Sequence, residues 1–225
     1  MSPDDAAVTP GGDPVVSPTL REQVAVRIRR ALLAGELKPG QRIKEVRLAT
    51  ALGVSRPTLR ESLQQLIHEG ALVHVPYKGI RMASPTAEEL VGVAEVRVAL
   101  ETVAALKLSR DPHGRAMDAV REALRIHLDA LDAGDELLSD MTHLDLHRTL
   151  WERSGSVTLR KIWPLIGSQV QMALTVDQAM IRDPERDRRM HRRLVQVIEE
   201  GDEATITAEV HGHIQLSVDE LIRRL

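Results

Sequence analysis

The sequence contains no cysteine and no phenylalanine, and it has only one tyrosine and two tryptophans among its 225 residues. Without cysteine, disulfides and thiolate metal sites are excluded, so a bound metal would need nitrogen or oxygen ligands. Aliphatic side chains and alanine must therefore fill the core. There is no apolar run long enough to cross a membrane, and the acidic, Pro- and Gly-rich residues 1–18 do not resemble a signal peptide. We expect a cytoplasmic protein.

The formal net charge is only −3, but the charges are unevenly distributed. Residues 19–83 hold 12 Lys and Arg against 5 Asp and Glu, a balance of +7, whereas residues 1–18 carry −3 and residues 84–225 carry −7. A positive field confined to one segment is typical of a DNA-binding domain. We expect a disordered tail over 1–18, a DNA-binding domain over 19–83, and an effector-binding and dimerisation domain over 84–225.

The basic segment carries, in order, the signals of a helix-turn-helix followed by a two-stranded wing. Gly53 can break an apolar helix, and Ser55 is a good N-cap for the next helix. Apolar residues then recur on one helical face until Gly70, which suits the end of that helix. The elements expected here are helices over 20–35, 44–52 and between 55 and 70, and short strands over 72–75 and 80–82 around a turn. This order predicts a winged helix-turn-helix domain.

Two arginines lie four residues apart in the N-terminal half of the second helix of this motif, at Arg56 and Arg60. That half of a recognition helix meets base edges in the major groove, where arginine can pair with guanine. Short hydroxyl side chains and a lysine in the wing turn suit phosphate contacts. The DNA contacts we predict are Ser55, Arg56, Thr58, Arg60, Lys78 and Gly79. The alternative is a small helical domain whose arginines are merely solvated.

From residue 84 onward there is no convincing strand pattern. Turn and breaker residues separate six expected helices, at about 86–110, 113–134, 136–154, 156–182, 184–200 and 202–224. The fold class predicted for the whole chain is therefore mainly α, a winged helix-turn-helix domain followed by an all-α helical bundle.

Four of the nine histidines fall at positions that suggest a metal site inside this bundle. His143 and His147 are four residues apart and can point at one spot, while His191 and His213 come from later helices. Three or four imidazoles that meet inside a bundle would bind a divalent metal such as Zn²⁺ or Ni²⁺. The alternative is that these are solvated helical histidines, which is what we expect of His113 and His127.

Arg97 lies beside the apolar stripe of the first bundle helix, four residues before Glu101. A buried arginine needs a partner, and an internal pair with Glu101 at helical spacing is one interpretation. The other is that Arg97 binds the carboxylate of an effector, because its planar guanidinium matches a carboxylate.

Two parts of the chain resemble a known family. Residues 37–83, LKPGQRIKEVRLATALGVSRPTLRESLQQLIHEGALVHVPYKGIRMA, are similar to the DNA-binding domain of the GntR family of bacterial transcription regulators. Residues 144–163, LDLHRTLWERSGSVTLRKIW, and 191–214, HRRLVQVIEEGDEATITAEVHGHI, resemble the FCD domain of its FadR-like subfamily. One local departure is Pro57-Thr58 where the family usually has Thr-Pro, which we expect to alter a phosphate contact rather than the fold.

The resemblance implies a metal held by Asp-x-x-x-His on one helix and by two later histidines. His147, His191 and His213 match the family histidines, but His143 stands where the family usually has aspartate. Asp145 is a poor replacement, because two residues along a helix is a rotation of roughly 200°. The resemblance therefore implies a site of four histidines, with one negative charge fewer than usual.

The function these observations predict is a metabolite-responsive transcription regulator, with the role of a repressor favoured over that of an activator. It would be a homodimer on a palindromic operator, because one small winged helix contacts few bases. The effector implied by the resemblance is a small organic or sugar acid, such as lactate or gluconate, bound at the metal. A metal-dependent hydrolase fused to a DNA-binding domain is disfavoured, since no glutamate follows His143 as in His-Glu-x-x-His. An architectural DNA-binding protein without an effector would leave the acidic second domain unexplained.

Overall fold

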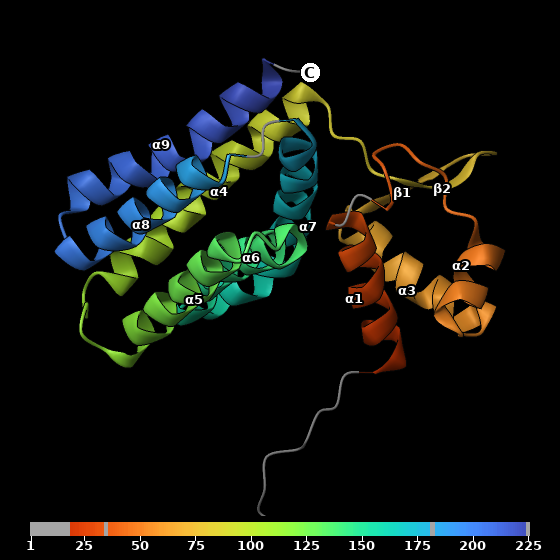
Figure 1. Ribbon diagram of the computed structural model, residues 1–225, viewed down its shortest axis with the longest axis horizontal. Helices are drawn as coiled ribbons and strands as arrows, with labels where there is room; N and C mark the ends of the chain where they lie inside the picture. The colour runs from red at the N-terminus through yellow and green to blue at the C-terminus, as the bar shows by residue number, and fades with distance from the viewer. Residues whose placement is uncertain (1–18, 34–35, 181–182, 224–225) are drawn as a thin grey trace, which may run out of the picture.

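The computed structural model describes the backbone of residues 19–33, 36–180 and 183–223, and it forms two lobes (Figure 1). The predicted tail over 1–18 lies outside the described residues. The mainly α fold class, a winged helix-turn-helix followed by a helical bundle, is confirmed. None of the described helices is long and apolar enough to span a membrane.

The first lobe contains the predicted helix-turn-helix and wing. Its elements are α1 (Leu20–Leu33), α2 (Glu45–Leu52), α3 (Arg56–His68), β1 (Leu72–Val75) and β2 (Gly79–Met82). Gly53 has φ of 67°, the left-handed conformation that glycine adopts without strain, and it ends α2 so that the chain can turn into α3. β1 and β2 pair antiparallel, with Leu72 opposite Met82. Leucines from α3 and apolar residues of α1 and the wing form the core of this lobe.

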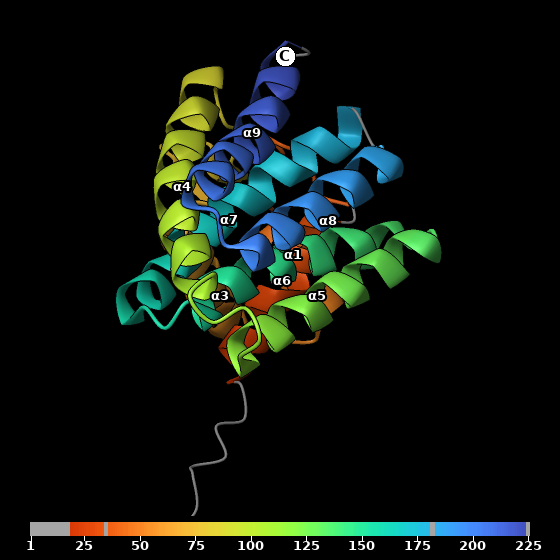
Figure 2. The ribbon, with the colours of Figure 1, turned by 90° about the vertical axis from the view of Figure 1, so that its left-hand side faces the viewer.

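The second lobe is a bundle of α4 (Ala87–Leu108), α5 (Arg115–Asp132), α6 (Glu136–Arg153), α7 (Val157–Met180), α8 (Pro184–Glu200) and α9 (Glu203–Ile222). Thr86 begins α4 with a capping box, in which its hydroxyl accepts from the backbone N–H of Glu89 while the Glu89 carboxylate accepts from that of Thr86. Figure 2 shows α8 lying between α9 and α5, and α4 packs along α9. The side chains that α4, α6, α8 and α9 turn inward therefore meet.

Helix α7 belongs to the bundle but also packs against the first lobe, where it lies beside α1 (Figure 1). Met172 of α7 is buried in the hydrophobic core of the first lobe. On the same helix, the Ser168 hydroxyl donates to the carbonyl of Glu69, and Nε2 of Gln171 donates to the carbonyl of Arg29 at 3.0 Å. These contacts join α7 to the first lobe.

Candidate metal centre and nucleic-acid interface

Three buried histidines from three helices meet inside the bundle. His147 lies on α6, His191 on α8 and His213 on α9, and their side chains are 0%, 2% and 6% exposed. Each offers a ring nitrogen that lies within 4.8 Å of those of the other two. The sequence predicted that these three would meet, and the packing of α8 between α9 and the α5–α6 pair brings them together.

The hydrogen bonds of two of these rings leave lone pairs that face each other. Nδ1 of His147 lies 2.8 Å from a Glu101 carboxylate oxygen, and Nδ1 of His191 lies 2.9 Å from the backbone carbonyl oxygen of Asp187 and 2.5 Å from its carboxylate. Carboxylate and carbonyl oxygens can only accept, so each neutral ring carries its proton on Nδ1 and has a bare Nε2. The two Nε2 atoms are 3.3 Å apart. Two ligands of one tetrahedral zinc ion lie about 3.3 Å apart when the zinc–nitrogen bonds are 2.0–2.1 Å long, so this pair fits a shared metal.

The protonation states of His147, His213 and Glu101 also favour a metal site. Burial lowers the pKa of His147, although the neighbouring Glu101 carboxylate opposes this, and burial lowers the pKa of His213 well below its ordinary value. Burial alone would raise the pKa of Glu101, but Arg97 and His147 outweigh it and hold that pKa at about 2. His147 and His213 are therefore neutral near pH 7, and a metal does not have to displace protons from these two donors.

His143 is grouped with His191, but not with His147 or His213, among the residues that could hold a metal. Its ring lies 5.1 Å from that of His147 and 4.3 Å from that of His191, measured between ring centroids. The group to which it belongs consists of His127, His143, Asp187 and His191. Asp145 is exposed, as its helical position predicted.

The expectation that His127 is solvated is wrong, because its side chain is fully buried. Nδ1 of His127 lies 3.1 Å from the Thr142 hydroxyl and its Nε2 lies 3.1 Å from an Asp187 oxygen. These partners come from α6 and α8, so they stabilise a polar ring in the core in a way that helical spacing on α5 does not reveal. His113 is exposed, as expected.

Two sequence signals could have identified the residues that were missed. His127 continues the apolar face of α5, seven residues after the buried Val120. Asp187 precedes His191 by four residues, so α8 itself carries an Asp-x-x-x-His pattern.

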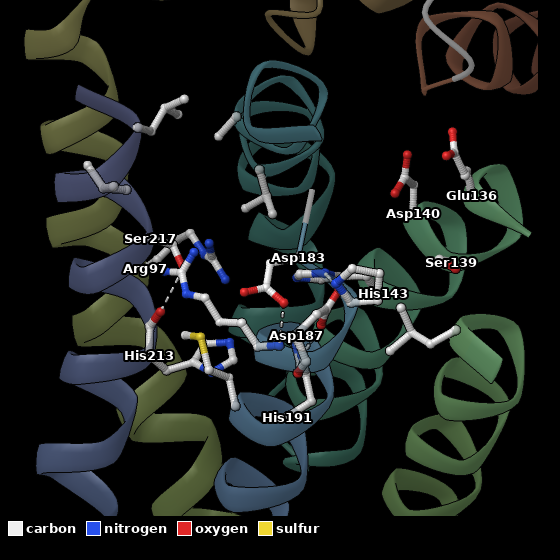
Figure 3. Close-up of a pocket in the computed structure, with 18 of the residues that line it drawn as sticks. Arg97, Glu136, Ser139, Asp140, His143, Asp183, Asp187, His191, His213 and Ser217 are labelled. Atoms are coloured by element: carbon white, nitrogen blue, oxygen red, sulfur yellow. Dashed lines mark hydrogen bonds and ion pairs between the residues drawn. The ribbon is translucent and has the colours of Figure 1, made fainter. Parts of the chain in front are cut away.

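A cavity of about 190 Å³ opens beside the histidines. Figure 3 shows His213, His191 and His143 along it, with Arg97 beside His213 and with Glu136 and Asp140 at the other end. The Arg97 side chain is only 11% exposed, and its Nε lies 2.8 Å from Glu101. Arg97 thus forms the internal pair that its spacing allowed, and it also lines the cavity.

The predicted DNA contacts gather on α3 and the wing. The Ser55 hydroxyl accepts from the backbone N–H of Thr58, so it is the N-cap that the sequence predicted, and the two hydroxyls lie 2.8 Å apart. Arg56 is exposed beside them at the start of α3. Lys78 is exposed in the wing turn, where Gly79 has φ of 80°.

Arg60 lies one turn further along α3, and its side chain is 60% exposed. Its Nε lies 2.7 Å from a carboxylate oxygen of Glu45 on α2. This pair holds the guanidinium in one orientation above the helix-turn-helix, which is an arrangement that can present it to a base edge.

Comparison with known proteins agrees with this architecture. The family model described as bacterial regulatory proteins, gntR family, matches residues 20–82, and the FCD domain model matches residues 92–216. A protein named "Probable D-xylose utilization operon transcriptional repressor" from Paenarthrobacter nicotinovorans is 26% identical over 82% of this chain and 80% of its own length. The Nta operon transcriptional regulator of Aminobacter aminovorans is 28% identical over 82% of this chain and 86% of its own length.

Solved structures show the same fold. The Escherichia coli protein McbR/YncC superposes with a TM-score of 0.77 at 20% identity, covering 92% of this chain and 99% of that one. A GntR transcriptional regulator from Rhodococcus sp. RHA1 gives a TM-score of 0.79 at 19% identity, covering 91% and 98% of the two chains.

Proposed function

The chain belongs to the GntR family of bacterial transcription regulators and carries an FCD domain, and from this premise we propose that it is a metal-dependent, metabolite-responsive repressor. Its domains and relatives are those of a DNA-binding transcription regulator and not of an enzyme. The role of repressor is supported by the names of relatives, among them the transcriptional repressor GlaR of Escherichia coli, which is 26% identical over 57% of this chain.

The observation that carries the metal is the pair of bare Nε2 atoms on His147 and His191, 3.3 Å apart in a buried site that His213 completes. Two lone pairs at this distance repel each other unless a cation lies between them. A divalent ion with a preference for imidazole, Zn²⁺ or Ni²⁺, suits three neutral nitrogens. When bound, it supplies a Lewis acid that can anchor an oxygen of the effector.

The effector we propose is a small carboxylate in the cavity beside these histidines. His191 and His213 line that cavity, so a ligand there has access to the metal position. Arg97 lies on the same wall and offers a guanidinium as a second anchor. The cavity of about 190 Å³ is suited to a small organic or sugar acid rather than a large ligand.

On the DNA side, we propose that Arg56 and Arg60 read bases and that Ser55, Thr58, Lys78 and Gly79 position the domain on phosphates. This assignment is supported by the exposure of Ser55, Arg56, Arg60 and Lys78, and by the charge balance of +7 over residues 19–83. We further propose a homodimer on a palindromic operator, since paired half-sites are the rule for helix-turn-helix readers. Sedimentation that finds only monomer, with and without DNA, would overturn the dimer.

Metal content and operator binding test the proposal together. His147→Ala should lose most of the metal found in the wild-type protein by elemental analysis, whereas His211→Ala, an exposed histidine on α9, should keep it. A duplex operator selected from a random pool should be released or bound more tightly when lactate, gluconate or a related acid is added to the metal-loaded protein. Equal metal content in both variants would overturn the metal site. If the operator binding of His147→Ala still responds to the acids, the effector does not need the metal.

A further inference from the structure

The turn of the wing holds the chain's only tyrosine in a conformation that suits glycine. Tyr77 has φ of 61°, and no other described residue apart from glycine has a positive φ. The N–H of Lys78 donates to the carbonyl of Val75 at 3.0 Å, with Pro76 and Tyr77 between them. This is the pattern of a type II turn, which requires a positive φ at its third residue and favours glycine or asparagine there. A bulky side chain at that position is strained.

The packing of Tyr77 does not compensate for this strain. Its side chain is fully exposed, at 107% of the reference area. The aromatic ring therefore contributes no buried apolar area to the fold. Strained residues of this kind cluster at sites that bind a ligand, where the strain belongs to the function. Tyr77 is thus a candidate for contact with a molecule outside the chain.

The base of the wing fixes the position of this turn. The segment before α2 adds to the outer edge of β2. There the N–H of Ile43 donates to the carbonyl of Ile80 at 2.9 Å, and the N–H of Met82 donates to the carbonyl of Gln41 at 2.8 Å. Figure 1 shows both strands extending from the first lobe on the side away from the bundle. The backbone of Tyr77 is therefore held in place, and binding does not have to order a flexible loop.

Two cations lie near this tyrosine. Lys78 follows it in the turn and is exposed. Arg42 is exposed as well, and its guanidinium lies beside Gly79, with Nε 3.7 Å and Nη2 3.8 Å from the position of a Cβ on that glycine. The surrounding segment, residues 19–83, has a charge balance of +7. An exposed aromatic ring with cations near it suits a polyanion that carries flat bases better than it suits an apolar protein surface.

The connection of the wing to α3 indicates which groove of a duplex the turn meets. β1 begins four residues after the end of α3, and the N–H of Ala71 between them donates to the carbonyl of Leu66 at 2.9 Å. The wing is therefore attached to the recognition helix, whose N-terminal half is proposed to lie in the major groove. The next groove along a duplex is the minor groove, on the other side of a phosphate strand. Lys78 and Arg42 suit the phosphates of that strand, while Tyr77 is free to enter the groove.

We propose that Tyr77 enters the minor groove beside the major-groove contact of α3 and selects A·T pairs there. The proposal rests on the proposed binding of an operator and adds a specificity-determining residue to it. The minor groove is about 6 Å wide, and a G·C pair places the N2 amino group of guanine in it, whereas an A·T pair offers only acceptors. The phenolic hydroxyl can donate to such an acceptor, and the guanine amino group stands in its way. The minor groove of A·T-rich DNA is also narrow and strongly negative, which favours Lys78 and Arg42.

Variants at Tyr77 separate the role of the ring from the stability of the turn. Tyr77→Asn and Tyr77→Gly supply residues that tolerate a positive φ, so both should melt at the temperature of the wild type or a few degrees above it. Both should nevertheless bind the operator selected by the wild-type chain about tenfold more weakly, as expected for the loss of one base contact. Val73→Thr, at an exposed apolar position in β1, is the control and should bind as the wild type does.

Changes in the operator test the groove and the base pair. Each A·T pair that flanks the selected half-sites is replaced in turn by G·C and by I·C, because inosine lacks the minor-groove amino group but keeps the O6 and N7 edge of guanine in the major groove. In anisotropy titrations of the full chain, one G·C replacement should weaken binding of the wild type about tenfold, and I·C should restore most of the affinity. Tyr77→Asn should bind the A·T, G·C and I·C duplexes with similar affinity.

The remaining outcomes separate this proposal from the proposed function. If Tyr77→Asn binds the selected operator as tightly as the wild type does, or if I·C binds as weakly as G·C, the role of Tyr77 in the minor groove is overturned while DNA binding stands. An equal loss on every duplex, random ones included, would assign the ring to the phosphate backbone and would also overturn the selection of A·T. If the wild-type chain enriches no duplex from the random pool, the proposed function fails, and this proposal fails with it.

Discussion

Glu101 holds Arg97 and His147 together, with one carboxylate oxygen 2.8 Å from Nε of Arg97 and the other 2.8 Å from Nδ1 of His147. One buried carboxylate thus connects the proposed effector anchor to the proposed metal ligand. A carboxylate behind a histidine fixes the orientation of the ring and raises its basicity toward a metal. Arg97 makes this pair with its Nε atom. Its pairing with Glu101 is therefore compatible with the proposed contact between its guanidinium and an effector.

Glu101→Gln should weaken metal binding about 10- to 100-fold, because the neutral amide can still accept a hydrogen bond but no longer makes His147 more basic. The measurement is Zn²⁺ affinity by chelator competition. Glu95→Gln, an exposed position on the same helix, is the control and should match the wild type. Equal affinities in the two variants would contradict the role of Glu101. A thermal melt separates loss of affinity from loss of fold.

The metal-free protein should lose stability as the pH falls below about 6.5. Burial lowers the pKa of His143 from 6.5 to about 3, and it lowers those of His147 and His213. Between these values the unfolded chain binds protons that the folded chain does not, so the free energy of unfolding decreases with decreasing pH. Glu101 adds to the loss below pH 4.5, because its folded pKa is about 2.

Urea midpoints in the presence of a chelator at pH 7.5, 6.0 and 5.0 measure this effect. The midpoint should fall over that range, and His143→Gln should show a shallower dependence because one buried imidazole is absent. A midpoint that is constant from pH 7.5 to 5.0 would mean that these rings are not buried as neutral groups.

Arg60→Ala should remove specific operator binding while leaving the fold and the metal content unchanged. A bidentate arginine–guanine contact gives about 1–3 kcal/mol of discrimination, so each half-site should lose roughly tenfold or more in affinity. Gel shifts with the selected operator measure this loss. Arg110→Ala removes the same charge from an exposed position in the bundle and should bind as the wild type does. An unchanged shift for Arg60→Ala would exclude this residue from base readout.

Lys78→Ala should behave differently, because an exposed lysine in the wing turn is suited to a phosphate and not to a base. Its loss should weaken binding to operator and random duplex alike, and should reduce the slope of log affinity against log salt by about 1 per contact. Anisotropy titrations at several salt concentrations report both effects. A loss confined to the operator would instead assign Lys78 to sequence readout.

Local signals were sufficient to predict most of the fold. The cap at Ser55, the breaker at Gly53 and the pattern of apolar residues are properties of short segments, so the helix-turn-helix and the six bundle helices could be placed from the sequence. The meeting of His147, His191 and His213 depends on how distant helices pack, so their spacing only suggested it and the resemblance to a family strengthened the prediction.

The contacts of His127 and Glu101 could not be predicted from local sequence signals. His127 sits on an apolar face and is stabilised there by Thr142 and Asp187, which are 15 and 60 residues away in the sequence. Glu101 likewise meets His147 across 46 residues. Helical periodicity relates residues within a few turns, so it cannot identify these partners.

Helix α7 offers a direct path from the cavity to the DNA-binding lobe. Val170 and Ala173 line the cavity, while Ser168, Gln171 and Met172 of the same two turns contact the first lobe. A ligand that moves this stretch of α7 must also move its contacts with α1 and the end of α3. Coupling requires contacts that differ between two states. Removing the hydrogen bonds between α7 and the first lobe should therefore reduce the effect of the effector on operator affinity more than it reduces the binding of metal or operator.

The double variant Ser168→Ala/Gln171→Ala should therefore bind Zn²⁺ and operator nearly as the wild type does, but respond less to the effector. Couplings between sites are typically 5- to 150-fold in affinity, and we expect the change in operator Kd on addition of Zn²⁺ with lactate or gluconate to fall toward onefold. Amide exchange in α1 and α3, compared with and without Zn²⁺, gives a second readout. Lys161→Ala, an exposed change on α7, is the control. A full response in the double variant would mean that the signal reaches the recognition helices by another route, such as the contact between α1 and α6.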